Sequence, residues 1–182
     1  MATSQVIFIG GRSGVGKSTV AFALHDLLAE HDLQHAVIEG DCLDLAHPTP
    51  WKHHLAERNL AAVWANYRDL GYQRLIYTNT VSVLEIPALT QAIGDGTEVT
   101  AVLLRANDST TATRLRKREQ GDSLQRHLHR SSAMAARLDQ EAASSVHRID
   151  TNGQTPLGIA EQILTLSHWA RSFVSPEDAS DK

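Results

Sequence analysis

Residues 6–19 read Val6-Ile7-Phe8-Ile9-Gly10-Gly11-Arg12-Ser13-Gly14-Val15-Gly16-Lys17-Ser18-Thr19. They contain G-x-x-x-x-G-K-[ST], a phosphate-binding pattern that lies between a strand and a helix. An apolar run precedes the pattern here and a helix-period run follows it, which disfavours the alternative of a glycine-rich turn with a chance lysine. Such glycines let backbone N–H groups face an anion. We therefore expect a nucleoside triphosphate to bind at Gly11, Arg12, Ser13, Gly14, Val15, Gly16, Lys17, Ser18 and Thr19, with Lys17 on the β and γ phosphates and Ser18 on Mg²⁺.

The rest of the chain alternates short apolar runs with helix-period segments. We predict strands at 5–10, 35–40, 74–78, 98–104 and 146–150. Helices are predicted over about 54–70, 84–93 and 109–120, in a segment that reaches about 143, and after Thr155 and Pro156. This alternation is typical of βα units around a parallel sheet. The predicted fold class is α/β: a three-layer α/β/α P-loop fold with five parallel strands and a small helical lid.

Length, charge and cysteine content restrict the function classes. The 182 residues suit one domain, which we place at 1–174 with a lid at about 119–135 and a disordered tail at 175–182. Lys and Arg number 17 against 21 acidic residues, so the net charge of −4 indicates no extended nucleic-acid surface. Cys42 is the single cysteine, and no signal segment or membrane-length apolar run occurs. We expect a soluble, cytoplasmic protein whose oligomeric state the sequence does not indicate.

Two acidic residues follow the predicted second strand. In parallel sheets ligands bind at the carboxyl ends of strands, so Glu39 and Asp41 are expected beside the P-loop. Their spacing of two places both carboxylates on one side of an extended chain. We predict that Glu39 binds Mg²⁺ through water and that Asp41 accepts a proton from an attacking hydroxyl. The alternatives are that Asp41 caps a helix beginning at Cys42, and that Asp44 either contacts substrate or is simply solvated.

A second group of candidates is basic. Arg114 and Arg118 share one helical face, and Arg126 and Arg130 share another, so four guanidiniums can converge from two segments. Planar cations suit nucleobase stacking and the charge of a transferred phosphoryl group, which favours a mobile basic lid. The alternative is a solvated face paired with acidic neighbours, the usual fate of a charge run.

The motifs together resemble the small P-loop kinases of the nucleoside monophosphate kinase-like group, which includes gluconate, shikimate and adenylylsulfate kinases and chloramphenicol phosphotransferase. The resemblance rests on the P-loop, E-G-D at 39–41, R-L-x-x-R at 114–118 and I-D-T-N-G at 149–153, within residues 5–172. It implies that Asp41 activates the acceptor hydroxyl, and that Arg114 lies near adenine. The lid arginines Arg118, Arg126 and Arg130 would contact phosphates. The loop formed by Thr151, Asn152 and Gly153 would lie along adenine.

Several features depart from that pattern or point elsewhere. The strand at 74–78 has no acidic residue after it, and no guanine-reading N-K-x-D motif occurs, which favours ATP as the donor. Among the ten histidines, His53 and His54 are adjacent, and His127 and His129 are two apart on a predicted helix, so neither pair has helical chelating spacing and a zinc site is not expected. His47 and Trp51 are candidates for substrate contact, although an aromatic residue at this spacing is more often part of the core.

The sequence thus predicts a small-molecule kinase that uses ATP and Mg²⁺ to phosphorylate a hydroxyl. Lys17, Asp41, Arg126 and Arg130 are the predicted catalytic residues. Two alternatives are a non-catalytic ATP-binding regulator and a polynucleotide 5′-hydroxyl kinase. The acceptor itself is not predicted.

Overall fold

A computed structural model describes residues 3–116 and 122–169, except for the side chains of 122–124, 126 and 127. Its sheet has five parallel strands in the order β2-β3-β1-β4-β5. The strands are β1 (Gln5–Gly10), β2 (Ala36–Glu39), β3 (Arg74–Thr78), β4 (Glu98–Arg105) and β5 (His147–Asp150). The predicted five-stranded parallel sheet is confirmed, with every strand within two residues of its predicted ends.

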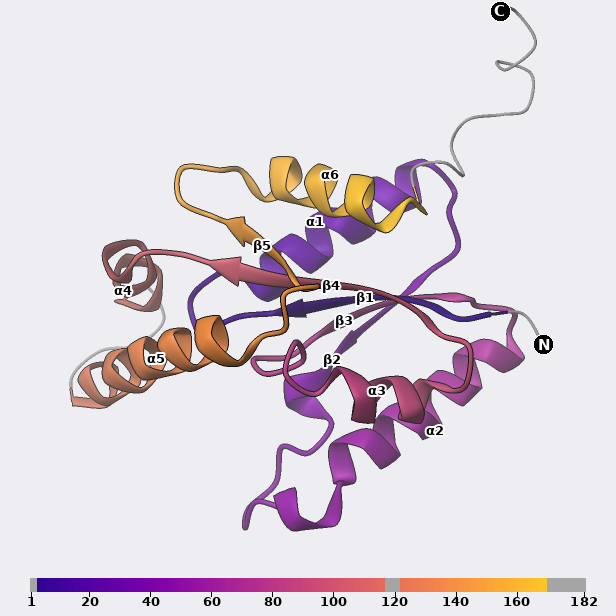
Figure 1. The fold of residues 1–182 in the computed structure, drawn as a ribbon, viewed down its shortest axis with the longest axis horizontal. Helices are drawn as coiled ribbons and strands as arrows, with labels where there is room; N and C mark the ends of the chain where they lie inside the picture. The colour runs from indigo at the N-terminus through magenta and orange to yellow at the C-terminus, as the bar shows by residue number, and fades with distance from the viewer. Residues whose placement is uncertain (1–2, 117–121, 170–182) are drawn as a thin grey trace, which may run out of the picture.

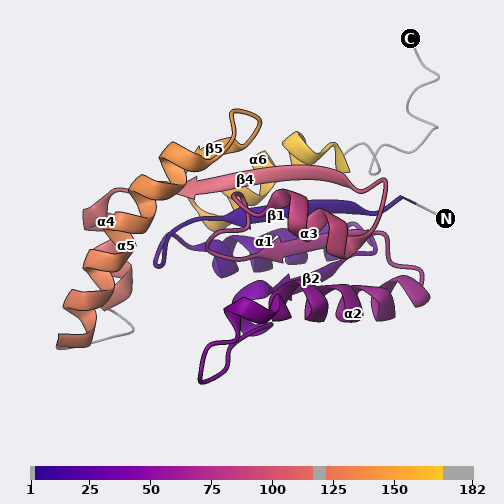
Figure 2. The same cartoon turned by 60° about the horizontal axis from the view of Figure 1, so that its bottom comes forward.

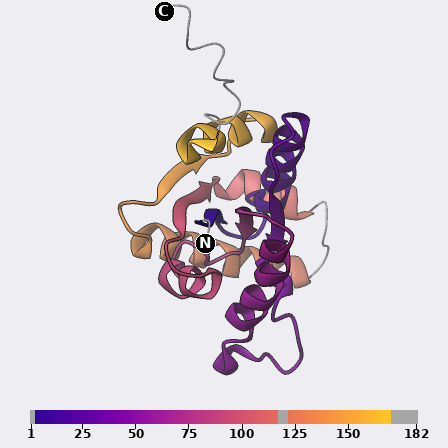
Figure 3. The same cartoon turned by 90° about the vertical axis from the view of Figure 1, so that its right-hand side faces the viewer.

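Helices cover both faces of this sheet. In Figure 1, α1 (Lys17–Glu30) and α6 (Pro156–Ser167) lie above the sheet, and α2 (Leu55–Asp69) and α3 (Ile86–Ile93) lie below it. Figure 3 shows the same layers from the end of the sheet. This arrangement confirms the predicted α/β/α class.

Two apolar cores explain the layering. Side chains alternate across a strand, so Ile7 and Ile9 of β1 face α1 and α6, whereas Val6 and Phe8 face α2 and α3. All four are buried. The central strand is apolar on both faces because each face is covered by helices.

The remaining helices lie at the carboxyl end of the sheet. Figures 1 and 2 show α4 (Asp108–Arg116) and α5 (Asp122–Glu141) there, beyond the tips of β1 and β4. Leu138 and Ala142 anchor the end of α5 in the core below the sheet. The predicted lid region, 119–135, therefore consists largely of the first part of a 20-residue helix. The predicted tail at 175–182 lies outside the described residues.

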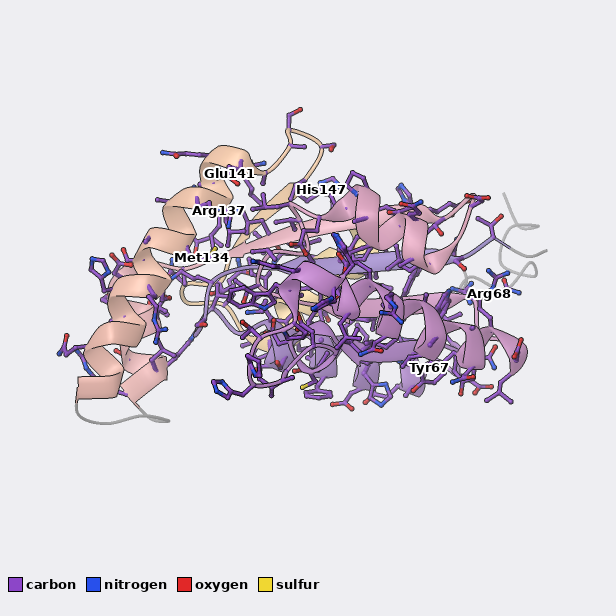
Figure 4. The ribbon with its side chains drawn as sticks, turned by 90° about the horizontal axis from the view of Figure 1, so that it is seen from below. Tyr67, Arg68, Met134, Arg137, Glu141 and His147 are labelled. Carbon is purple, nitrogen blue, oxygen red and sulfur yellow. The ribbon has the colours of Figure 1, made fainter. Side chains whose placement is uncertain are left out.

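Figure 4 views the molecule from below. Met134, Arg137 and Glu141 lie along α5, far from Tyr67 and Arg68 of α2. Met134 packs against the lower core, and Arg137 Nε lies 3.0 Å from Glu141 Oε2.

None of the described helices is long and apolar enough to span a lipid bilayer.

A histidine pair joins α1 to the segment before β2. His25 Nδ1 lies 2.8 Å from His35 Nε2, and His35 Nδ1 lies 2.6 Å from the carbonyl oxygen of Leu33. If His35 is neutral, its Nδ1–H donates to Leu33 and its Nε2 accepts from His25. Burial lowers the pKa of His35, and the charges of His25 and Arg74 lower it further, against the raising effect of the Leu33 bond. The folded protein therefore disfavours protonated His35.

This lowered pKa predicts how stability depends on pH. Because the folded-state pKa lies below the unfolded value of about 6.5, the contribution of His35 is present above that pH and is lost as pH falls through the folded pKa. We expect the urea midpoint to fall between pH 7 and pH 5. In His35→Gln, which cannot be protonated, it should fall less. Equal decreases in both proteins would contradict this account.

Candidate active site

The predicted phosphate-binding residues line a cavity of about 420 Å³ at the carboxyl end of the sheet. Eight consecutive residues, Ser13 to Val20, form one wall. Asp41 after β2, Arg114 of α4 and Thr151 after β5 also line it. The fold thus brings the predicted residues Asp41, Arg114 and Thr151 to the same cavity as the P-loop.

The P-loop backbone requires its glycines. Gly11, Gly14 and Gly16 have φ values of 146°, 80° and 107°, which residues with a Cβ rarely adopt. A Cβ on Gly11 would lie 2.8 Å from the carbonyl oxygen of Leu104, and one on Gly14 would lie 2.9 Å from Leu115 Cγ. The loop can therefore pass close to β4 and α4 only with glycine at these positions. Because α1 begins at Lys17, its N-terminal N–H groups and its dipole adjoin the cavity.

Lys17 folds back across the loop. Its Nζ donates to the carbonyl oxygen of Gly11 at 2.9 Å and to Thr80 Oγ1 at 3.4 Å. Gly11 is not part of the cavity wall, and its own N–H donates to the carbonyl oxygen of Thr80 at 3.1 Å. Gly11 therefore shapes the loop and positions the lysine, although we had predicted that it contacts the nucleotide.

Asp41 lies beside the same threonine. The N–H of Thr80 donates to Asp41 Oδ1 at 3.4 Å, so the segments after β2 and β3 meet at the lysine. The chain turns into a 3-10 helix over Gly40–Cys42, which has no side-chain cap, so the alternative role of Asp41 as a helix cap is wrong. Gly40 makes this turn possible, since a Cβ there would lie 2.2 Å from the Tyr77 hydroxyl oxygen.

Glu39 is placed differently from the prediction. The extended chain ends at Glu39, so Glu39 and Asp41 are not two alternating positions of one strand. Glu39 does not line the cavity. Its Oε1 is nevertheless buried and makes no hydrogen bond to the described residues. Glu39 shares its face of β2 with Val37, which packs against the core on the α1 side.

Arg114 links three elements at the other end of the cavity. Its Nη1 donates to the carbonyl oxygen of Val15 at 2.7 Å and to Thr151 Oγ1 at 3.1 Å. Thr151 is 1% exposed, and its hydroxyl also lies 3.3 Å from the Val15 oxygen. The sequence predicted both Arg114 and Thr151 for this site, and the structure gives them a shared contact with the P-loop.

Arg12 does not face this cavity. It is 5% exposed, and its guanidinium bonds Asp108 through Nη1 and Ser131 Oγ through Nε, the latter at 3.1 Å. This bond to Arg12 lowers the pKa of Asp108. The chain turns at Gly11 and directs the Arg12 side chain toward α4 and α5, and Arg12, one of the predicted nucleotide-binding residues, does not line the cavity.

Two residues of the loop after β5 also differ from expectation. Asn152 lines a separate cavity of about 320 Å³, and its Oδ1 accepts from the N–H of Asn107 at 3.2 Å. Gly153 has a φ of 68° and lies in neither cavity wall. Of the three residues predicted to lie along adenine, Thr151 is the one that lines the cavity of about 420 Å³ beside the P-loop. Asn152 instead joins this loop to the segment before α4.

The predicted lid arginines do not converge in the described part of the structure. Arg130 is exposed on α5 and does not line the cavity. Arg118 lies outside the described residues, and so does the side chain of Arg126. Of the two arginines whose side chains the structure describes, Arg114 contacts the P-loop and Arg130 does not line the cavity.

Sequence reasoning missed several residues of the cavity wall. They come from the α4 and β5–α6 segments and from α1, namely Val20, Leu115, Gln154, Pro156 and Ile159. Thr80 was missed as the partner of Lys17 and Asp41. One signal was available: Thr80 follows β3 and Gln154 follows β5, and ligands gather at the carboxyl ends of parallel strands.

Acidic side chains, including Asp41, raise the pKa of a buried tyrosine. Tyr77 is 1% exposed, and its pKa is raised first by burial and then by the charges of Glu85, Asp41, Asp44 and Glu57. The pKa of Glu85 is raised by burial and by Glu57, against the opposing effect of Arg137. Tyr77 is thus a neutral phenol over the accessible pH range.

The acceptor-side candidates lie mostly at the surface. His47 is exposed, and Trp51 is 72% exposed. Figure 2 shows the loop between β2 and α2 projecting from the molecule. Trp51 is therefore not a core residue in this structure.

The site's donor set suits Mg²⁺ and a polyphosphate. Ser18 offers a hydroxyl and Asp41 a carboxylate in the cavity wall, and hydroxyl and carboxylate oxygens are the ligands that Mg²⁺ takes. The buried Oε1 of Glu39 is an acceptor without a hydrogen-bond donor among the described residues. Such an atom can accept from a metal-bound water.

A family model matches the N-terminal part of the chain. The family model of adenylylsulphate kinase matches residues 3–60, which include the P-loop and Asp41. A tRNA dimethylallyltransferase from Thermobifida fusca (strain YX) is 30% identical over an alignment of 167 residues, which covers 83% of this chain. The chain spans about half the length of that relative, 50%.

Solved structures match nearly the whole chain. A sugar kinase from Janibacter sp. HTCC2649 aligns with a TM-score of 0.67 and 22% identity, covering 96% of this chain and 99% of its own. A tunicamycin resistance protein from Deinococcus radiodurans aligns with a TM-score of 0.62 and 24% identity, covering 89% and 94%. A gluconokinase from Sinorhizobium meliloti 1021 gives a TM-score of 0.58 at 19% identity, covering 94% and 96%. The predicted resemblance to small P-loop kinases is confirmed at the level of the fold.

Proposed function

We propose that this chain, which has the fold of the small P-loop kinases, is a phosphotransferase that moves the γ-phosphoryl group of ATP to a hydroxyl of a small molecule. The observation that carries the proposal is that Lys17 and Asp41 both line one cavity and both contact Thr80. A cation for the phosphates and a base for the acceptor thus stand side by side. A mere nucleotide-binding site has no need of the base.

The chain's residues divide the work of the transfer. The P-loop N–H groups and Lys17 would hold the β and γ phosphates, and Arg114 with Thr151 would bound the nucleoside end. Asp41 would accept the proton of the acceptor hydroxyl while the oxygen of that hydroxyl forms a bond to the γ phosphorus. The bond from that phosphorus to the β,γ-bridging oxygen breaks, ADP leaves, and Asp41 later returns the proton to water. Positioning and charge stabilisation supply most of the rate enhancement in such reactions.

Mg²⁺ would be held by Ser18 directly and by Glu39 through water. When bound, it neutralises charge on the β and γ phosphates. The buried, unbonded Oε1 of Glu39 supports this assignment, and the absence of Glu39 from the cavity wall is consistent with an indirect contact. Arg130, Arg118 and Arg126 stay predicted as lid residues that close over the phosphates.

The proposal is tested by transfer of labelled γ-phosphate from ATP and Mg²⁺ to pooled sugars, sugar acids, nucleosides and hydroxylated antibiotics. An oligonucleotide with a free 5′ hydroxyl is included, as is tRNA. A labelled small molecule, absent when Asp41→Asn replaces the wild type, supports the proposal. Label on the oligonucleotide would favour a polynucleotide kinase. Binding of ATP with no labelled product from any pool would favour a regulatory protein.

A further inference from the structure

A buried hydroxyl of α5 contacts the P-loop on the side away from the nucleotide cavity. Ser131 is 3% exposed, and its Oγ donates to the carbonyl oxygen of Ser13 at 3.0 Å. Ser13 lines the nucleotide cavity, whereas Ser131 does not. The Ser13 carbonyl therefore points out of the site toward α5.

The buried guanidinium of Arg12 fixes this hydroxyl. Arg12 Nε donates to Ser131 Oγ at 3.1 Å, so the hydroxyl accepts one hydrogen bond and donates another. Arg12 is held in turn by Asp108, the first residue of α4. A buried hydroxyl with both bonds made has one orientation, because rotation would leave polar groups unsatisfied.

The direction of one peptide follows from these contacts. In a trans peptide the C=O of one residue and the N–H of the next point in opposite directions. With the Ser13 carbonyl held toward α5, the Gly14 N–H is turned the other way, toward the cavity that both residues line. Backbone N–H groups of this kind are what a P-loop offers to phosphate.

We propose that Ser131 and Arg12 are positioning residues that together hold the Gly14 N–H in its phosphate-binding direction and thereby tie α5 to the nucleotide site. The inference rests on the proposed function only in that the ligand is ATP. It explains why an arginine within the P-loop is buried and directed away from the phosphates. It also makes α5 a fixed support of the loop at position 131.

Nucleotide affinity tests this inference without any acceptor. The dissociation constant of ATP with Mg²⁺ is measured by calorimetry for the wild type, Ser131→Ala and Ser132→Ala. We expect about a tenfold weaker affinity in Ser131→Ala, the effect of losing one oriented hydrogen bond. Ser132→Ala is the matched control, because Ser132 is the exposed neighbour on α5. Its Oγ lies 3.4 Å from Asp108 Oδ2, and its loss leaves the bonds of Arg12 to Asp108 and to Ser131 in place, so ATP affinity should stay within about twofold of the wild type.

Two more measurements separate positioning from general stability. In Ser131→Ala, the amide ¹H–¹⁵N resonance of Gly14 should shift in the free protein and respond less to ATP. Arg12→Lys, which keeps a charge for Asp108 but lacks the Nε that bonds Ser131, should weaken affinity too. The double variant should bind no worse than about the weaker single variant, because the two residues act as one unit.

Each result decides between distinct readings. Unchanged ATP affinity in Ser131→Ala, with or without a lower melting temperature, overturns the positioning role and leaves the proposed kinase intact. Equal losses in Ser131→Ala and Ser132→Ala also overturn it. A wild-type protein that binds no ATP overturns both proposals.

Discussion

Lys17→Ala is expected to lower kcat by about 10²- to 10³-fold, the loss typical of removing one preorganised charge-stabilising donor. Lys17 Nζ lies between Gly11 and Thr80, where it can swing onto a bound polyphosphate. Alanine removes the cation and leaves the glycine-rich backbone in place. ATP affinity should fall as well, because the lysine contacts the phosphates in the ground state as well as during transfer. Steady-state kinetics with an acceptor identified by the transfer assay measure the effect.

The fold of this variant is checked before its kinetics are interpreted. The Lys17 side chain packs in no apolar core, so we expect the urea midpoint of Lys17→Ala to match the wild type closely. Lys17→Arg keeps the charge but not the compact ammonium, and should recover little activity. Turnover near the wild-type rate in Lys17→Ala would contradict the assignment of Lys17 to the phosphates.

Asp41→Asn is expected to lower kcat by about 10²- to 10⁴-fold with ATP affinity nearly unchanged, the range typical of losing a general base. An asparagine keeps an Oδ1 that can accept the hydrogen bond from the Thr80 N–H. The substitution therefore removes the proton acceptor while the meeting of the β2 and β3 ends is preserved. Single-turnover transfer and ATP calorimetry, run on the same sample, separate the two effects.

A remote carboxylate supplies the control for charge. Asp69, at the end of α2, lines a groove on the α2–α3 side and not the nucleotide cavity. Asp69→Asn removes the same charge and should leave kcat within about twofold of the wild type. Full activity in Asp41→Asn would show that another group accepts the proton. Loss of ATP binding would indicate that Asp41 serves the nucleotide instead.

Local sequence was sufficient wherever function and fold are encoded in one short stretch. The strand, glycine turn and helix of residues 5–30 follow from an apolar run, three positive-φ glycines and a helical apolar period. The parallel strands and the helical layers on both faces of the sheet follow from the alternation of predicted strands with predicted helices. Asp41 was predictable because it follows a strand, and strand ends gather at one edge of the sheet, whereas Thr151 was implied by the family resemblance.

Side-chain direction was not predictable for residues whose partners lie far along the chain. Arg12 belongs to the P-loop in sequence, yet Ser131, 119 positions later, determines where it points. Glu39 and Asp41 are separated by a 3-10 turn that depends on the close approach of Gly40 to Tyr77. Arg130 was predicted to share a helical face with Arg126, but a shared face does not determine the direction in which the helix presents it, and Arg130 does not line the cavity.

The sequence by itself determined the fold class and the phosphate-binding loop, because the alternation of strands and helices and the positive-φ glycines are encoded in short stretches of the chain. The tertiary structure alone decided which polar side chains meet. Lys17, Thr80 and Asp41 come together, and Arg12 turns to α5, because buried donors and acceptors must find partners wherever packing brings them. That requirement couples residues far apart in the chain, and no local pattern records it.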